Sequence, residues 1–393
     1  MQAQKHPIYN LQFGLLCLSS LLFSASFNML IPELPSYLEG LGGSEYKGLI
    51  IALFTLTAGI SRPFSGRLTD TIGRVPVMAF GSIVCFVCGF LYPVLAWVAG
   101  FLFLRLMHGF STGFKPTATA AYVADIAPKE RWGEALGIHG LAFSTGMAIG
   151  PAIGSYITLY FSINVLFYIS SAFALLSIII LMNMKETLAP ELRQRFHPRL
   201  LKIKRTDIIA PEVIPAAVVI FLSYLGYGAI LTLIPDKTEF LGIANKGLFF
   251  MAFTLASLVV RFAAGKASDK YGRTSVIKVG LGMLIAAFTL IGYADSFVVL
   301  MTGAAVYGIS QGVLSPALNA WTVDMSLPEH RGKAMATMYI ALEAGIGMGA
   351  LFAGWYYADV ITRIPMVMYG AAGVTCMALG YMFFYKKSPK VES

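Results

Sequence analysis

Long charge-free stretches alternate with short polar segments along most of the chain. They cover residues 11–31, 48–61, 75–104, 135–184, 213–235, 247–260, 279–294, 296–323, 334–358 and 364–385, with His139 and Glu343 as the exceptions inside them. A helix needs about 20 apolar residues to cross a bilayer, so the stretches at 75–104 and 135–184 are each long enough for two helices. They divide at the turn residues Tyr92 and Pro93 and near residues 160–164. With one helix continued past Arg105 to about residue 123, the pattern predicts twelve membrane spans.

Composition supports a membrane protein and excludes several other classes. Hydrophobic residues make up 57% of the chain and charged residues 12%, with a mean hydropathy of +0.72. Soluble domains carry about 25% charged residues, so a soluble enzyme, a disulfide scaffold and a nucleic-acid-binding protein are excluded. Cys85 and Cys88 lie in an apolar run without a nearby histidine, which indicates packing and not a metal site. We expect no cofactor. The first stretch is too long for a signal-peptide core, which predicts a retained span.

The distribution of Lys and Arg predicts the orientation. Of 29 basic residues, four lie on one predicted side (Lys47, Lys237, Lys246 and Arg363) and two lie within the membrane (Arg105 and Lys115). The others share the side of both termini, so the positive-inside rule places the termini in the cytoplasm. We therefore expect a multi-pass plasma-membrane protein, in a bacterial inner membrane.

An internal repeat at an offset of 199 to 200 residues divides the chain into two halves. GRLTDTIGR from Gly66 matches GKASDKYGR from Gly265, with Arg62 and Arg261 four residues upstream, and DIAPKERWGEA matches DMSLPEHRGKA. The polar segment 185–210 lies between the repeats, so we predict six-helix halves at 1–184 and 211–393 joined by a cytoplasmic linker. Two similar halves can rock about a site between them, which is the arrangement for alternating access.

The repeated loops resemble the loop signature of the major facilitator superfamily. The residues that carry the resemblance are Gly66, Asp70, Gly73 and Arg74 in the first copy and Gly265, Asp269, Gly272 and Arg273 in the second. The first copy departs from the family pattern at Thr71, where a basic residue commonly follows the acid. The resemblance implies an all-α membrane fold of twelve helices, with the loop acids and arginines holding a cytoplasmic gate.

The fourth predicted span carries a polar stripe. Arg105, His108, Thr112, Lys115 and Thr119 follow one helical face, and RLMHGFSTG resembles a second motif of the family, with His108 in place of a commoner Gln. A charge near the bilayer centre costs about 2.5–3.5 kcal/mol or more, so the stripe predicts a watered cavity or buried partners. Arg105, and likewise Lys115, could instead only brace neighbouring helices through backbone carbonyls. We assign to the substrate cavity the residues Arg105, His108, Thr112, Lys115, Asn28, Tyr227, Gln311, Ser315 and Asn319.

The fifth span contains GMAIGPAIG, in which Gly146, Gly150, Pro151 and Gly154 resemble the motif typical of the superfamily's antiporters. Small residues at this spacing allow very close approach of another helix, which we expect at the interface between the halves. Plain helix packing explains the spacing equally well, so the prediction of export comes from the resemblance.

Glu343 is the only carboxylate deep inside a predicted span, and its depth matches that of Lys115. Desolvation favours its protonated form, so we predict that Glu343 carries the coupled proton, and a pair with Lys115 is a hypothesis. The resemblance implies a proton-coupled exporter of small amphiphilic molecules. The alternatives are a proton symporter importing a sugar or organic acid and, with less support, a polytopic membrane enzyme. The expected partners are a small-molecule substrate, protons and the bilayer, with no nucleic acid, and we expect a monomer.

Overall fold

The computed structural model describes residues 10–128, 131–202, 209–327 and 331–385. Within these ranges the chain forms helices and no strands. The long helices are α1 (Leu11–Asn28), α3 (Lys47–Thr71), α4 (Arg74–Leu91), α5 (Val98–Ile126), α6 (Trp132–Tyr160), α7 (Ile163–Met182), α8 (Ile214–Phe240), α9 (Leu248–Tyr271), α10 (Arg273–Tyr293), α11 (Phe297–Met325), α12 (Arg331–Tyr357) and α13 (Ile364–Phe384), and α2 (Leu34–Gly40) is short.

The twelve long helices confirm the predicted spans. Ten helical segments in the described ranges are long and apolar enough to cross a membrane, and the two parts of α9, Leu248–Arg261 and Ala263–Tyr271, pass together although they meet at 50°. Helix α5 brings the number of long helices to twelve. It does not reach the apolarity of these segments, because it carries the charged residues Arg105 and Lys115. The divisions predicted near Pro93 and residues 160–164 coincide with the breaks between α4 and α5 and between α6 and α7.

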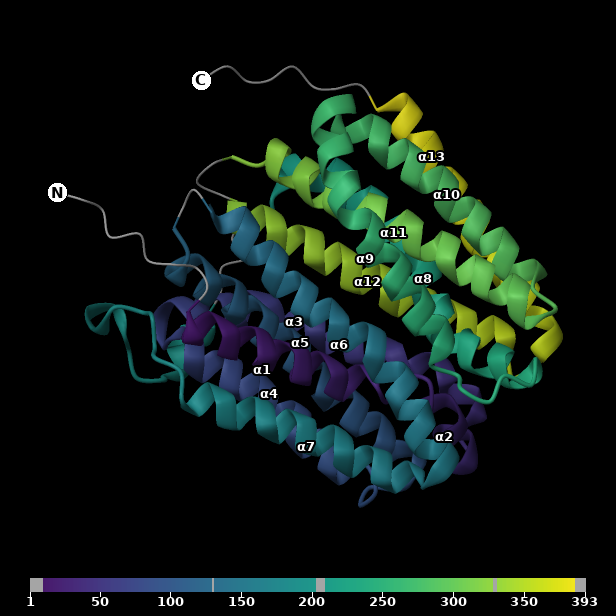
Figure 1. Ribbon diagram of the computed structural model, residues 1–393, viewed down its shortest axis with the longest axis horizontal. Coiled ribbons are helices and arrows are strands. Elements are labelled where there is room, and N and C mark those ends of the chain that lie inside the picture. Colours follow the sequence, from purple (N-terminus) through teal and green to yellow (C-terminus); the bar gives the residue numbers. More distant parts are fainter. Residues whose placement is uncertain (1–9, 129–130, 203–208, 328–330, 386–393) are drawn as a thin grey trace.

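The helices form two bundles that lie side by side (Figure 1). Helices α1 to α7 make the first half and α8 to α13 the second, and the halves meet where α3 packs on α12 and α6 on α9. Linker residues 183–202 pack on the first half, where the amide N–H of Gln194 donates to the carbonyl of Thr71 at 2.7 Å. The exact boundaries at 184 and 211 stay a prediction. The terminal basic residues and linker residues 203–208 lie outside the described residues.

Two helices extend further than the charge-free stretches predicted. The sequence places span ends at Ser61 and Val260, but α3 continues to Thr71 and α9 to Tyr271. Arg62 and Arg261, which the sequence analysis assigned to the loop side, therefore lie inside helices and line a cavity. The physical reason is that an arginine inside a span, where it faces a cavity, interrupts a charge-free stretch in the same way as an arginine in a loop. The sequence pattern therefore ends the helix too early.

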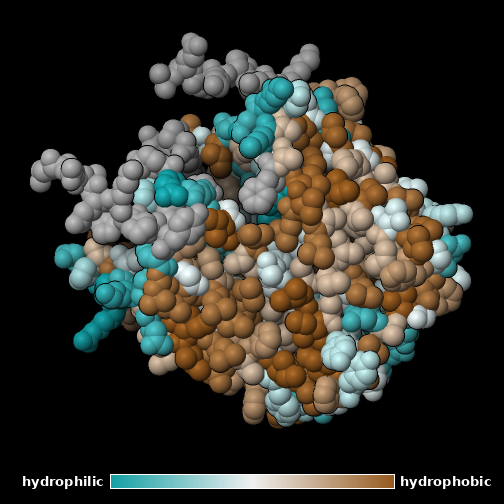
Figure 2. All heavy atoms as spheres, in the orientation of Figure 1, coloured by the Kyte–Doolittle hydropathy of each residue, from teal (hydrophilic) through white to brown (hydrophobic). Residues whose placement is uncertain are grey.

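The outer surface of the bundle is suited to lipid. Figure 2 shows brown hydrophobic side chains across the middle of the molecule and teal hydrophilic ones gathered towards opposite edges. Large apolar side chains are exposed on the described part of the chain, including Val259 at 80% and Trp355 at 78%. An apolar belt of this kind is costly in water and favourable in a bilayer.

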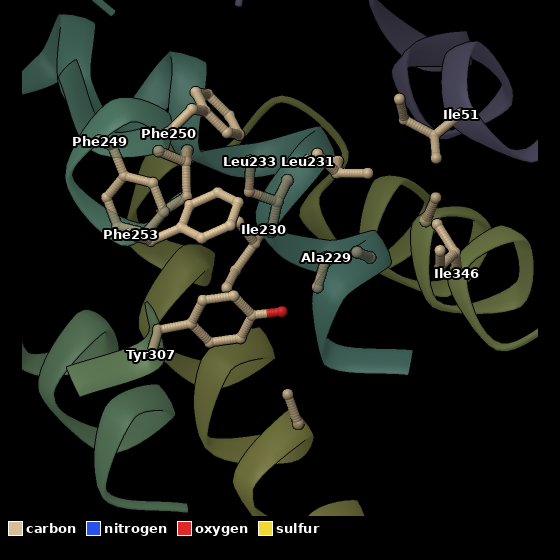
Figure 3. Packing of buried hydrophobic residues seen from close by; sticks show 14 of the residues in the cluster. Ile51, Ala229, Ile230, Leu231, Leu233, Phe249, Phe250, Phe253, Tyr307 and Ile346 are labelled. Carbon is tan, nitrogen blue, oxygen red and sulfur yellow. The ribbon is translucent and has the colours of Figure 1, made fainter. Parts of the chain in front are cut away.

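The main core runs through both halves. Figure 3 shows Phe249, Phe250 and Phe253 of α9 packed around α8, with Tyr307 of α11 below them. Ile51 of α3 and Ile346 of α12 belong to the same buried cluster, so apolar packing continues across the boundary between the halves.

The glycines of the predicted antiporter motif contact a different helix from the one expected. A Cβ added to Gly154 would lie 2.0 Å from the carbonyl oxygen of Met29, the residue that follows α1, and Gly146 and Gly150 approach α1 itself. These contacts lie within the first half, so the expectation that the glycines lie at the interface between halves is wrong. The motif reaches the other half through Pro151, whose carbonyl oxygen would lie 2.1 Å from a Cβ on Gly247.

We expect Gly154→Ala to destabilise the first half. The obstructing atom is backbone, so α1 and α6 must move apart, and such overpacking costs typically about 1–3 kcal/mol. Thermal unfolding of the purified protein measures this as a lowered Tm. Gly137→Ala is the matched control, because Gly137 lies on the same helix with nothing within 4 Å of an added Cβ. Equal Tm values for both variants and the parent would contradict the close packing.

Candidate functional site: the central cavity

A cavity of about 1600 Å³ lies between the two halves. Its lining includes Phe54 and Tyr227, which lie inside α3 and α8, and Asp70 and Lys333, which lie at the end of α3 and the start of α12 and mark its rim. The rim is on the face where α3 gives way to α4 and where linker residues 183–202 lie, which we call the linker face. The cavity is therefore open at the linker face and closed towards the opposite face, which we call the Lys47 face.

Lys47 closes the opposite face with a cluster of ion pairs. Its Nζ lies 2.9 Å from Glu39 in its own half, and 2.8 Å from Asp236 and 2.6 Å from Asp359 in the other half. The lysine side chain is only 3% exposed, so these carboxylates replace the water that an ammonium group needs. The cluster holds the halves together where the cavity ends.

Hydrogen bonds and close backbone contacts reinforce this closure. Lys246 of the second half lies 2.7 Å from the hydroxyl of Ser36 and 2.5 Å from Glu239. A Cβ on Gly48 would lie 2.6 Å from the carbonyl oxygen of Ala350, so α3 and α12 can approach this closely only without a side chain there.

The sequence analysis missed the Lys47 cluster. Asp236, which follows Pro235, lies inside α8 and pairs with Lys47. Glu33 accepts a hydrogen bond from Ser155 at 2.5 Å within the first half. A signal for this cluster was present in the sequence, since Lys-Gly-Leu occurs in both repeats. In the structure, Lys47 and Lys246 of these two segments both lie beside carboxylates at this face.

The structure places five of the predicted cavity residues on the cavity wall and four elsewhere. The lining residues are Asn28, Arg105, Thr112, Tyr227 and Ser315. His108, Lys115, Gln311 and Asn319 are not among them. The polar stripe predicted on α5 therefore has two environments. Arg105 and Thr112 line the cavity, whereas His108 and Lys115 contact neighbouring helices of the same half.

Lys115 is buried inside the first half. Its Nζ donates to the carbonyl of Ser19 at 3.1 Å and also contacts the hydroxyls of Ser19 and Ser177, while the ring of Phe23 lies 4.6 Å away. These groups come from α1 and α7, which leaves no approach to α12. The hypothesis that Lys115 pairs with Glu343 is wrong.

His108 and Arg105 brace α5 against its neighbours, whereas the hydroxyls of Thr112 and Thr119 donate to carbonyls within α5. His108 lies 3.1 Å from the hydroxyl of Tyr92 and 3.2 Å from the sulfur of Cys85. Arg105 donates from Nε to the carbonyl of Ile50 at 2.8 Å, and its guanidinium lies 4.6 Å from the ring centroid of Phe54. Arg105 thus both braces helices and borders the cavity.

Glu343 pairs with Arg62 across the boundary between the halves. The arginine Nη2 lies 2.8 Å from the carboxylate, and the two side chains are 12% and 10% exposed. The ring of Tyr339 lies 4.4 Å from the Arg62 guanidinium. Gly59 permits this approach, because a Cβ there would lie 3.3 Å from Cβ of Glu343. Among the described residues, ion pairs between the halves involve only Lys47 and Arg62, both on α3.

Glu343 also borders a smaller, apolar groove between α3 and α12. This groove has a volume of about 540 Å³, and it shares Thr55, Pro63 and Glu343 with the central cavity. The carboxylate therefore stands in a thin wall between the central cavity and an apolar surface. A charge in that position needs its counterion.

The two loop motifs form equivalent ion pairs within their own halves. Arg74 lies 2.9 Å from Asp125 and 3.5 Å from Asp70. The second copy repeats this geometry, with Arg273 beside Asp269 and 3.0 Å from Asp324. The glycines that precede the arginines, Gly73 and Gly272, have φ angles of +138° and +87° that disfavour other residues. Gly66 and Gly265 have nothing within 4 Å of an added Cβ.

We expect Asp70→Asn and Asp269→Asn to slow transport while changing equilibrium substrate binding by only a few-fold. Their side chains are 72% and 68% exposed in this open state, so their charges are available for contacts that form when the linker face closes. Initial transport rate and binding affinity, measured on the same preparation, check this. Glu191→Gln, an exposed change beside the first half, is the control. Binding lost in proportion to rate would place these acids in the substrate site.

The sequence model of the Major Facilitator Superfamily matches residues 16–243 and 216–393. The chain is 29% identical over 319 residues to the multi-drug resistance efflux pump PmrA of Streptococcus pneumoniae, covering 78% of this chain and 79% of that protein. It is 25% identical over 378 residues to the quinolone resistance protein NorA of Staphylococcus aureus, covering 93% and 94% of the two chains.

Solved structures share the fold at low sequence identity. The D-xylose-proton symporter superposes with a TM-score of 0.78 at 16% identity, covering 97% of this chain and 98% of that one. The human organic anion transporter MFSD10 superposes with a TM-score of 0.73 at 20% identity, covering 94% and 98%. With the family match over both repeats and twelve helices around a cavity sealed at one face, the chain belongs to the major facilitator superfamily and is a membrane transporter of small molecules.

Proposed function

We propose that this protein is a proton-coupled exporter of small amphiphilic molecules that works by alternating access. The observation that carries the proposal is the central cavity between two repeated halves, open at the linker face and sealed by Lys47 at the other. Similarity to proteins named multi-drug and quinolone resistance pumps supports export. The excess of Lys and Arg on the linker face supports a cytoplasmic position for that face.

The amphiphilic character follows from the cavity wall. Phe27 stacks on Phe54 with ring centroids 6.1 Å apart and lies 6.5 Å from Phe143, which makes an aromatic surface in the first half. Tyr224 and Ser315 in the second half offer hydroxyl groups. Cavities that combine an apolar wall with a few polar groups suit molecules of mixed character.

In the proposed cycle Glu343 takes up the proton. Protonation removes the charge that holds Arg62, so the ion pair between α3 and α12 weakens and the balance between the two orientations of the halves shifts. Opening at the Lys47 face requires the Lys47 cluster to separate. Import by proton symport remains the second candidate, because the D-xylose-proton symporter has the same fold, but that likeness is shared by the whole superfamily.

Proteoliposomes with an outward proton gradient and an enclosed pH dye test the proposal. Protein inserted with the linker face outward represents the inside-out orientation, and protease cleavage of the exposed linker measures that fraction. For export by proton antiport, adding a transported amphiphile outside should release protons from the vesicle interior as substrate accumulates inside. Substrate and protons moving in the same direction would overturn antiport and support the symporter.

A further inference from the structure

Arg261 is a cavity cation without a carboxylate partner. It lines the central cavity, and among the described residues no Asp or Glu forms an ion pair with it and its buried Nε has no hydrogen-bond partner. Arg105 differs, because the carbonyl of Ile50 and the hydroxyl of Tyr92 accept its hydrogen bonds. A guanidinium left in this condition inside a membrane protein favours an anion that can occupy the space before it.

The internal repeat explains why the partner is absent. Arg62 and Arg261 are equivalent, since they lie 199 residues apart, and the residue equivalent to Glu343 is Ser144. The helices agree with this register: Gly345 and Gly349 approach α8 as Gly146 and Gly150 approach α1. Helix α9 packs on α6 as α3 packs on α12. The second half thus supplies a carboxylate to the opposite arginine, whereas the equivalent position of the first half carries a serine.

The cavity as a whole carries an excess of positive charge, like Arg261 itself. Its described lining includes six cations and two carboxylates, and the cations are Arg62, Arg67, Arg105, Lys202, Arg261 and Lys333. One carboxylate, Glu343, is paired with Arg62, and the other, Asp70, lies at the rim beside Arg74. A cavity with this excess attracts anions and repels cations.

We propose that Arg261 binds the acidic group of an anionic or zwitterionic amphiphile, whose apolar part lies on the aromatic surface of Phe27, Phe54 and Phe143. The proposal rests on the proposed transport function and names its substrate class. The guanidinium forms charge-assisted hydrogen bonds with a carboxylate or sulfonate, and Ser144 and Tyr224, which also line the cavity, are available to hydrogen-bond the same group.

Two fluorescent probes of equal shape test this assignment. Dansylglycine carries a carboxylate and dansylglycinamide is neutral, so the ratio of their affinities for the purified protein in nanodiscs isolates the charge. The parent protein should prefer the anion. Arg261→Gln should weaken dansylglycine binding by roughly 10- to 100-fold and leave dansylglycinamide within a few-fold, because only the anion loses charge-assisted hydrogen bonds. Arg261→Lys should retain part of the preference.

A second variant tests the explanation from the repeat. Ser144→Glu restores the carboxylate that the opposite half already has, so it should pair with Arg261 and abolish the preference for dansylglycine. Lys278→Gln is the control, because it removes one positive charge from a residue that contacts Phe383 and does not line the cavity. The preference should survive that change.

The outcomes separate the two proposals. Dansylglycine binding that is unchanged in Arg261→Gln would overturn the role of Arg261, and so would an equal loss of both probes. If neither probe binds the parent protein or is moved by it in vesicles, the anionic substrate class is overturned. Transport of a cationic amphiphile in those same vesicles would then still uphold the proposed exporter, whereas failure of all three probes would overturn that function as well.

Discussion

Replacing Glu343 by Gln should abolish proton-driven accumulation of substrate while leaving exchange of substrate between the two sides of a vesicle intact. Glu343 is 8% exposed, and its carboxylate lies 2.8 Å from Arg62 across the boundary between the halves. Glutamine has similar shape but cannot gain or lose a proton, so the ion pair that distinguishes the two protonation states no longer forms. Without this difference between the protonated and the ionised state, a proton gradient cannot shift the balance between the two orientations of the halves. The ratio of internal to external substrate should therefore fall to about 1.

Proteoliposomes with clamped internal and external pH measure both quantities. Accumulation is followed under a proton gradient, and exchange is followed with labelled substrate at equal pH on the two sides. Asp295→Asn is the matched control, since it makes the same carboxylate-to-amide change at an exposed position of the second half. If Glu343→Gln still accumulates substrate under a proton gradient, the coupling group lies elsewhere, and Asp236 in the Lys47 cluster is the next residue to test.

Lys47→Gln should open the Lys47 face. The substitution leaves Glu39 of the first half facing Asp236 and Asp359 of the second without the cation that now joins them. Removing one partner from a buried ion pair costs about 3–5 kcal/mol, and here the penalty falls on the orientation that is closed at this face. The balance between orientations should therefore shift by about 100-fold or more towards opening at the Lys47 face.

Spin labels at Glu45 and Thr362, exposed positions on the two halves, report the separation of the Lys47 face. Their distance distribution should move to longer values in Lys47→Gln. Arg363→Gln serves as the control, because Arg363 donates to the carbonyl of Tyr356 within its own half. A distribution identical to that of the parent would show that the ion pairs do not hold the closed face together.

The sequence predicted the number and placement of most helices because hydrophobic length is a local property. The breaks near Pro93 and after Tyr160 were found from turn residues, and the two loop motifs from their repeated letters. The sequence analysis was wrong about Arg62 and Arg261, which it assigned to the loop side of the spans. Both lie inside long helices and face the cavity, and a charge in a helix has no sequence signal that separates it from a charge in a loop.

The cavity residues show a second kind of limit. Helical spacing correctly placed Arg105, Thr112 and Lys115 near one face of α5, but a face about 100° wide can border both a cavity and a neighbouring helix. Contacts with Ser19 and Ser177 show that Lys115 belongs to the interior of the first half. Equal depth also suggested that Lys115 meets Glu343, although depth says nothing about direction around the bundle.

By itself the sequence determined the membrane environment, the twelve helices and the twofold repeat, since these depend on residue type, segment length and self-similarity along one chain. Only the tertiary structure decided which charges meet: Glu343 with Arg62, Lys47 with carboxylates of both halves, and Arg261 with none among the described residues. These contacts join residues up to 312 positions apart, Lys47 and Asp359 being the extreme. Their geometry depends on how the helices rotate and pack, which no local pattern records.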